Sequence, residues 1–346
     1  MPETPASPRR KPLLVSASNG ARTWRLLADR DLERLAAGER ARILGVLRYA
    51  DGRNPAAPTP WPICDVPLSP LTRDPACIVL LGRAPTEALR IGDLTCRNDG
   101  ETLFGVLADP TATAPDIGAA TYQVYRTLLR VSAELGFPHL SRVWHYLPDI
   151  NAAPNGLEVY QAFSIGRREA LDAWGRIPDA ALPAACAIGT RQPGLRVAFL
   201  TTRSPGSTLS NIRQDEAYRY PPEYGPRSPA FSRALMIPNT AGPCLHVSGT
   251  ASIRGHRSRH AGRLEQQVEE TLRNLDALLQ PLGLSLQDAG SGTLLTVYLR
   301  HETDLAAAEA LLSGALRPDV QWLFLQGEIC RRSLLVEIEG IIDLLA

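Results

Sequence analysis

The chain has 346 residues, of which 44% are hydrophobic and 21% are charged, and its formal net charge at pH 7 is +1. This composition is typical of a globular protein with a core large enough for about two domains. The small net charge gives no reason to expect nucleic acid or a membrane surface as a partner, and no apolar run is long enough to cross a bilayer.

The basic residues and cysteines argue against several kinds of chemistry. Lys11 is the only lysine, so Schiff-base chemistry, pyridoxal phosphate attachment and a phosphate-loop lysine are not expected. The six cysteines and six histidines are dispersed without the spacing of zinc ligands, which indicates free thiols and no metal site. We therefore expect an enzyme, if the chain is one, to work without a cofactor through carboxylates and arginines.

The predicted elements follow residues 1–12, which we interpret as a disordered tail. No apolar signal-peptide stretch follows it, so we expect a cytoplasmic protein. In the first half, hydrophobic periodicity and turn residues predict strands and helices at 76–82, 125–136, 143–147, 160–171 and 195–200. A segment rich in proline, arginine and tyrosine spans 204–235. In the second half, the same signals predict elements at 243–249, 272–283, 294–299 and 334–340.

The two halves repeat one another. Both central helices are expected to end at a glycine followed by an apolar residue, Gly136 and Gly283, and a β-rich run follows each. The strand at 76–82 aligns with 243–249, and "LRVAFL" aligns with "LLVEIE". We therefore predict an α/β (α+β) protein with two tandem domains, 13–203 and 236–346. Each is a mixed sheet packed by helices on one face, and 204–235 connects them.

The final strand, "LLVEIEG", places Glu337 and Glu339 on one face. One interpretation is a solvated face of an antiparallel sheet. In the repeat, however, Glu337 aligns with Ala198 and Glu339 with Leu200, so this face is apolar in the first copy. A buried carboxyl group has a raised pKa and can act as a general acid near neutral pH. The repeat therefore favours Glu337 as a catalytic acid and Glu339 as a structural residue.

The second copy resembles the RidA/YjgF family in "VSGTAS", "QQVEETLRNLDALLQPLGLSLQD", "TVYLRHETD" and "VEIEGI". Over nearly its whole length the chain resembles a narrower family, the chorismatases. This resemblance rests on "VWHYLPDIN", "YQAFSIGRREAL", "NIRQDEAYRYPPEYGPRSPAFSRA" and "EICRRSLLVEIEG", and it is closest to the members that make 3-hydroxybenzoate. It implies two RidA-like halves in one chain, and an enzyme that splits chorismate into pyruvate and a ring acid.

Chorismate is a dianion, and arginine binds carboxylates well because its planar guanidinium can donate two parallel hydrogen bonds. We expect Arg213 and Arg227, with Tyr224 nearby, to contact the substrate. Tyr160 and Arg167 lie seven residues apart on a predicted helix, two turns along one face, so they are expected to reach one ligand together.

The resemblance also implies roles for two small residues. A cysteine at position 330 goes with 3-hydroxybenzoate formation in the family, and an alanine there goes with hydrolysis. Gly249 is expected to allow close backbone approach on the opposite side. The leading prediction is a chorismatase that makes 3-hydroxybenzoate, with 4-hydroxybenzoate as a second candidate product.

The alternatives are a hydrolytic chorismatase that gives a dihydroxycyclohexadiene carboxylate, and a non-catalytic RidA-like protein that binds a small carboxylate. We expect a monomer or a small homo-oligomer.

Overall fold

The structure is a computed structural model that describes residues 23–50, 59–71, 76–92, 94–175, 177–237 and 244–343. The predicted tail at 1–12 lies outside these residues. The α-helices of the described part are α1 (Ala37–Ala41), α2 (Ile117–Glu134), α3 (Val159–Gly175), α4 (Leu264–Leu279) and α5 (Leu305–Ala315). None of the helices described is both long and apolar enough to span a membrane.

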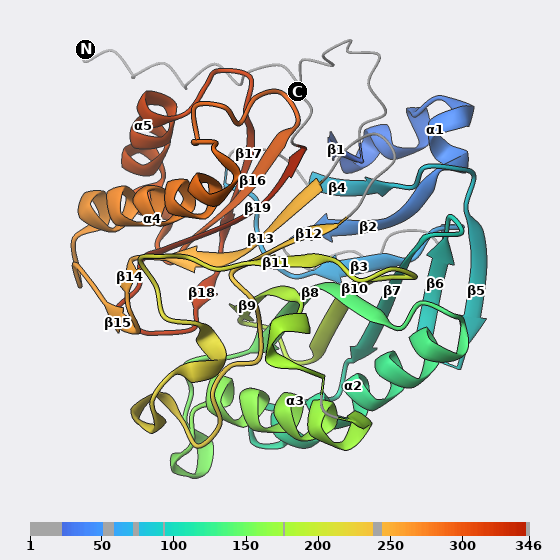
Figure 1. The fold of residues 1–346 in the computed structure, drawn as a ribbon, viewed down its shortest axis with the longest axis horizontal. Coiled ribbons are helices and arrows are strands. Elements are labelled where there is room, and N and C mark those ends of the chain that lie inside the picture. Colours follow the sequence, from blue (N-terminus) through green and yellow to red (C-terminus); the bar gives the residue numbers. More distant parts are fainter. Residues whose placement is uncertain are drawn as a thin grey trace, which may run out of the picture.

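Most strands belong to three sheets, which Figure 1 shows side by side with helices on the outside. A four-stranded sheet has the order β1-β4-β2-β3, with strands at Trp24–Ala28, Ala76–Leu81, Ile43–Tyr49 and Ile63–Val66. A seven-stranded sheet has the order β18-β9-β8-β10-β7-β6-β5, with strands at Glu328–Ile329, Ala184–Thr190, His139–Pro148, Leu195–Thr202, Thr102–Asp109, Leu94–Asn98 and Glu87–Ile91.

The third sheet has the order β11-β12-β13-β19-β16-β17, with strands at Ser207–Leu209, Ala234–Ile237, Cys244–Ala251, Val336–Asp343, Thr293–Leu299 and Gln321–Gln326. A small hairpin, β14 (Ile253–Arg254) and β15 (Arg257–Ser258), follows β13. Part of the predicted connecting segment at 204–235 therefore contributes β11 to the sheet of the second half.

The predicted tandem repeat is confirmed by strand order. The sequence β6-β7-β10-β8-β9 in the seven-stranded sheet has the same connections as β12-β13-β19-β16-β17 in the six-stranded sheet. In each copy one parallel pair, β8 with β9 or β16 with β17, is joined by a helix, and the remaining pairs are antiparallel. Helices α2 and α3 correspond to α4 and α5. The two halves therefore share one topology.

One predicted equivalence is wrong. The segment at 76–82 was expected to match 243–249, but β4 lies in the separate four-stranded sheet. The strand that occupies the place of β13 in the first copy is β7. Both β4 and β13 are almost wholly buried, so their apolar patterns are alike although their places in the fold differ. The first half therefore holds an additional sheet before the repeat begins.

The inner faces of the three sheets enclose a common apolar core. The cluster includes Trp24 and Leu47 from the four-stranded sheet, Trp144 from the seven-stranded sheet, and Leu294 and Ile341 from the six-stranded sheet. The outer faces of the two larger sheets pack against α2 and α3, and against α4 and α5. The helices therefore cover one face of each repeat, as predicted, and the opposite face is buried by its neighbours.

This arrangement decides the environment of the last strand. Glu337 and Glu339 lie on the face of β19 that also carries Ile341 into the common core. Their exposed fractions are 4% and 1%. The solvated-face interpretation is therefore wrong, because the face that would meet water in an isolated sheet meets another sheet here.

One strand from the second half of the chain pairs with the sheet of the first half. In sequence, strand β18 lies between β17 and β19 of the six-stranded sheet, but it pairs with β9 at the edge of the seven-stranded sheet. Glu328 pairs with Gly189, and Ile329 with Ile188. The carbonyl of Ile329 accepts hydrogen bonds from Asn151 Nδ2 and Arg300 Nη2, at 3.1 and 3.0 Å. Because β18 crosses over in this way, the next residue, Cys330, lies at the junction of the two halves, where the seven-stranded and six-stranded sheets meet.

Candidate active site

Glu337 occupies a central position at the junction. In β19 it lies between Tyr298 of β16 and Ala251 of β13. Burial raises the pKa of Glu337 to about 8, and the positive charge of Arg142 opposes this shift. Because a carboxyl group is neutral below its pKa, Glu337 carries its proton at neutral pH and can donate it.

Gly249 leaves room for this carboxyl group. A Cβ atom at this position would overlap Oε1 of Glu337, and it would lie 2.8 Å from Cδ of Glu337 and 3.4 Å from Cβ of Cys186. Strand β13 is held against β9 by Ser248, whose hydroxyl accepts a hydrogen bond from the Ala185 amide at 2.9 Å. The close approach expected at Gly249 is therefore present, and it is made to the candidate acid.

Tyr160 and Arg167 reach the same junction from the first half. Both lie on α3, so the predicted helix is confirmed. The pKa of Tyr160 is raised, first by burial and then by the charges of Cys330 and Glu337, and Arg167 opposes the shift. Tyr160 therefore lies within electrostatic reach of Cys330, Arg167 and Glu337.

Arg167 is buried, and no carboxylate pairs with it among the residues that the structure describes. Its exposed fraction is 2%, and within the described part of the chain neither Nε nor Nη2 has a hydrogen-bond partner. These two nitrogens form one edge of the guanidinium group, where two parallel N–H bonds can hold a carboxylate. A buried cation without a partner is costly. The arrangement therefore fits a ligand that brings a carboxylate.

His145, a second basic residue close to Arg167, is neutral. His145 is fully buried, and its Nε2 and Nδ1 lie 2.6 Å from the Tyr125 hydroxyl and 2.6 Å from the Cys186 carbonyl oxygen, respectively. Burial, followed by the charge of Arg167, holds the pKa of His145 well below its usual range. The positive charge at this end of the junction therefore belongs to Arg167, whose guanidinium also lies 5.1 Å from the centre of the Phe163 ring.

A close contact between two helices sets the position of Arg167. A Cβ atom at Gly166 would overlap the carbonyl oxygen of Gly118, so α3 approaches the backbone of α2 directly. The next residue along α3 is Arg167. A larger side chain at position 166 would push α3 away from α2 and move the guanidinium.

Cys330 follows β18 at the same junction. Burial, and after it the charge of Glu337, raise the pKa of its thiol to about 12. The thiol is therefore neutral, so it is poorly suited to be a nucleophile and well suited to shape a pocket. Arg331, next in the chain, opposes the shift and donates a hydrogen bond to the carbonyl oxygen of His256 at 2.8 Å.

The predicted ligands from the connecting segment have different placements. Tyr224 stacks on Arg331 at 4.0 Å, and its carbonyl oxygen accepts a hydrogen bond from Gln161 at 3.4 Å, so the segment lies next to the start of α3. Arg227 is exposed close by. Arg213 is directed elsewhere: its Nη2 donates to Glu270 at 2.6 Å, and its Nε donates to Asn274 at 3.0 Å. The carboxylate-binding edge of Arg213 is therefore occupied by α4.

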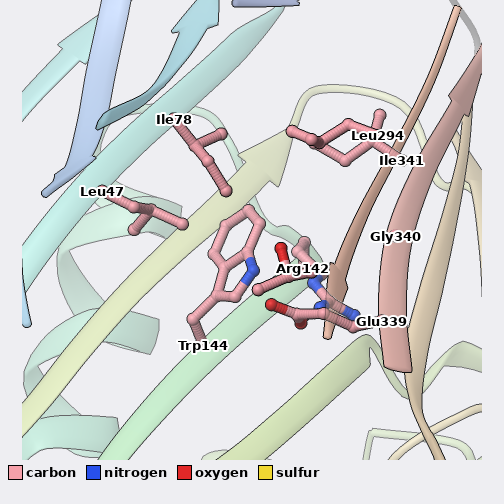
Figure 2. Close-up of a pocket in the computed structure, with 9 residues that line it drawn as sticks. Leu47, Ile78, Arg142, Trp144, Leu294, Glu339, Gly340 and Ile341 are labelled. Atoms are coloured by element: carbon pink, nitrogen blue, oxygen red, sulfur yellow. The ribbon is translucent and has the colours of Figure 1, made fainter. Parts of the chain in front are cut away.

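Sequence reasoning missed a buried ion pair beside Glu337. Arg142 of β8 donates from Nη2 to Glu339, and the hydroxyl of Tyr298 donates to the other carboxylate oxygen of Glu339 at 2.7 Å. Figure 2 shows Arg142 and Glu339 meeting beside Trp144, at a cavity of about 10 Å³, which is room for about one water molecule. No sequence signal pairs two residues 197 positions apart.

Residues 79–201 match the family model described as "Chorismatase FkbO/Hyg5-like, N-terminal". A 3-hydroxybenzoate synthase of Streptomyces hygroscopicus is 34% identical over 314 residues, covering 87% of this chain and 91% of that protein. A chorismatase of Streptomyces rapamycinicus is 37% identical over 254 residues, or 69% and 74% of the two chains. A crystal structure of a chorismatase superposes with a TM-score of 0.83 at 30% identity, covering 95% of this chain and 100% of that one.

Proposed function

Because the chain belongs to the chorismatase family of enzymes, we propose that it converts chorismate to 3-hydroxybenzoate and pyruvate. The observation that carries this proposal is that two groups act on Tyr160: a protonated Glu337, and a buried Arg167 whose Nε and Nη2 have no hydrogen-bond partner among the described residues. Arg167 suits a substrate carboxylate, and Glu337 can donate a proton in a water-poor site. A protein that only bound carboxylates would have no need of a buried, protonated glutamate such as Glu337.

The reaction begins at the enol ether. Glu337 transfers its proton to the methylene carbon of the enolpyruvyl group, which becomes an oxocarbenium ion. The neighbouring ring hydroxyl attacks the ring carbon that bears the ether oxygen, the bond between that carbon and the ether oxygen breaks, and the three-carbon fragment leaves as pyruvate. The bond from the hydroxyl oxygen to its original ring carbon then opens, so that the hydroxyl group stays on the carbon that pyruvate left. The ionised Glu337 takes up a proton from the ring, which restores the acid and yields the aromatic product. No atom is added or lost overall, since the two products together have the composition of chorismate.

Two arginines are proposed to bind the dianion. Arg167 holds one carboxylate through its buried edge, with Tyr160 on the same helix face. Arg227, exposed near Tyr224, holds the second carboxylate at the rim. Arg213, by contrast, is proposed to anchor the connecting segment on α4 through its ion pair with Glu270.

The direct test is to incubate the purified protein with chorismate and to separate the products by chromatography. The proposal predicts 3-hydroxybenzoate as the main ring acid, with one pyruvate released for each ring acid formed. A dihydroxycyclohexadiene carboxylate would instead identify the hydrolytic reaction. Binding of chorismate without any turnover would identify a carboxylate-binding protein. A minor 4-hydroxybenzoate peak is the predicted second product.

Replacing Cys330 with alanine should change the product without abolishing turnover. The thiol is neutral and lies near Glu337, so its removal enlarges the pocket beside the ring and leaves the acid in place. Water can then reach the oxocarbenium ion. We expect the share of 3-hydroxybenzoate to fall and the diene product to increase, measured by chromatography. An unchanged product ratio would show that Cys330 does not control access to the cation.

Replacing Gly249 with alanine should lower kcat by about tenfold or more. The added methyl group would overlap the Glu337 carboxyl group, which must then move away from its position, and a displacement of about 1 Å is enough to cost catalysis of this order. The melting temperature should be measured in parallel. Gly314→Ala on α5 is the matched control, because a Cβ atom there would meet no other atom within 4 Å. A Gly249→Ala variant with full kcat would contradict the placement of Glu337 in the reaction.

A further inference from the structure

The two glutamates of β19 have different partners although they share a strand face. Both carboxylate oxygens of Glu339 are hydrogen bonded, one to Arg142 and one to the hydroxyl of Tyr298. Arg142 also donates from Nη1 to the carbonyl oxygen of Val247 at 3.0 Å, so it contacts two strands of the second half. The exposed fractions of Arg142 and Glu339 are both 1%. The pair is therefore a fully buried ionic link between the two halves.

This link lies close to the candidate acid. Glu337 and Glu339 are two residues apart on one strand, so their Cα atoms are about 7 Å apart. At such a distance in a poorly solvated interior, a unit charge shifts a pKa by about one to two units. Removing the charge of either Arg142 or Glu339 should therefore change the pKa of Glu337.

We propose that the buried Arg142–Glu339 ion pair is a positioning device for Glu337, which anchors β19 against β8 and sets the proton affinity of the neighbouring carboxyl group. This inference rests on the proposed function, because it assigns the pair a purpose in delivering the proton. Arg142 and Glu339 are positioning residues: neither donates the proton, and both act through Glu337.

The other groups that face Glu337 carry no charge at neutral pH. Burial raises the pKa values of the thiols of Cys186 and Cys330 to about 12, and it raises those of the phenols of Tyr160 and Tyr298 above their usual range. They come from β9, the residue after β18, α3 and β16. Among the described residues, the charge that shifts the pKa of Glu337 is that of Arg142, which lowers it.

The two single substitutions are expected to shift the pKa of Glu337 in opposite directions. In Glu339→Gln the charge of Arg142 is no longer compensated, so the ionised form of Glu337 is favoured and its pKa falls. In Arg142→Gln there are two possible states of Glu339. If it stays ionised, it repels an ionised Glu337; if it takes up a proton, the attraction of Arg142 has still been lost. The pKa of Glu337 rises in both states.

The test is a titration of Glu337 by carbon NMR in the full chain. Glutamate is labelled with ¹³C at the side-chain carboxyl group, and the signal of Glu337 is assigned by its loss in Glu337→Gln. We expect the midpoint to move down by at least one unit in Glu339→Gln and up by at least one unit in Arg142→Gln. Arg142→Lys, which keeps the charge, should remain within half a unit of the wild type. Midpoints that stay unchanged, or that move in the same direction, would overturn the inference.

A double variant keeps the test decisive if the single variants do not fold, because each of those leaves one buried charge unpaired. Arg142→Gln combined with Glu339→Gln leaves no such charge. The two charge effects on Glu337 oppose each other in this variant, so it tests the anchoring role: its kcat should fall by about tenfold or more because β19 loses its anchor on β8, and a wild-type kcat would refute the proposal.

The titration needs no substrate, so its outcome is separate from that of the proposed function. Turnover of chorismate with unmoved midpoints would reject the ion pair's role alone. Moved midpoints without turnover in the wild type would reject the proposed reaction.

Discussion

Replacing Glu337 with glutamine should leave substrate binding intact and lower kcat by at least about 10²-fold, the usual contribution of a positioned general acid. Glutamine keeps the shape of the side chain and can donate a hydrogen bond, but it cannot deliver a proton to carbon. In the wild type the acid form is lost as pH rises through the Glu337 pKa near 8. The kcat of the wild type should therefore fall above about pH 8, and the residual activity of Glu337→Gln should lack this basic limb.

The control for this variant must not disturb a buried charge. Glu339→Gln is the obvious choice from the sequence, but it leaves Arg142 unpaired in the interior and is expected to destabilise the fold by about 3 kcal/mol or more. Glu328→Gln is the better control, because Glu328 is half-buried on β18. It should keep near wild-type kcat. Full activity in Glu337→Gln would remove this residue from the mechanism.

Replacing Arg167 with methionine should separate activity from stability. In the described part of the chain no carboxylate pairs with this buried guanidinium group, so its removal takes away a costly charge, and the melting temperature should stay equal or rise. The same change leaves a substrate carboxylate desolvated and unpaired. We expect kcat/KM to fall about 10²-fold, which corresponds to about 3 kcal/mol of lost transition-state binding.

Arg168→Met provides the matched control on the same helix. Arg168 pairs with Asp172 at 3.1 Å and with Asp179 at 3.2 Å, so its charge is engaged away from the junction. Its replacement should leave kcat/KM unchanged and lower stability slightly. If Arg167→Met destabilised the fold strongly and kept full kcat/KM, the guanidinium would be a structural group, and the proposed anion site would have to lie elsewhere.

Sequence patterns predicted those features that depend on local periodicity or on the repeat. Helix α2 ends just before Gly136, at φ 82°, as expected, because left-handed backbone at a helix end favours glycine. Helix α4 already ends at Leu279, and a 3-10 turn at Gln280–Leu282 leads to Gly283, at φ 70°. The burial of Glu337 followed from its alignment with Ala198. Tyr160 and Arg167 were placed on one helix by their spacing alone.

The remaining features depend on contacts between distant segments. The pairing of Arg142 with Glu339 joins the two halves, and no local pattern records it. Arg213 and Arg167 are both arginines in family motifs, and only packing shows that Glu270 occupies the first while the second has a free edge. Buried strands such as β4 also have similar apolar sequences in different parts of the fold. Sequence alignment alone therefore cannot assign such a strand to the correct sheet.

The exchange of β18 has a consequence for folding during synthesis. A chain emerges from the ribosome with its N-terminal part first, and domains generally fold in that order. The seven-stranded sheet must wait for β18, and the candidate acid lies on β19, so both arrive after every other strand described. Until then Arg167 can be in place, whereas Glu337 has not been made. A nascent chain can therefore acquire its proposed carboxylate-binding arginine long before it can catalyse anything.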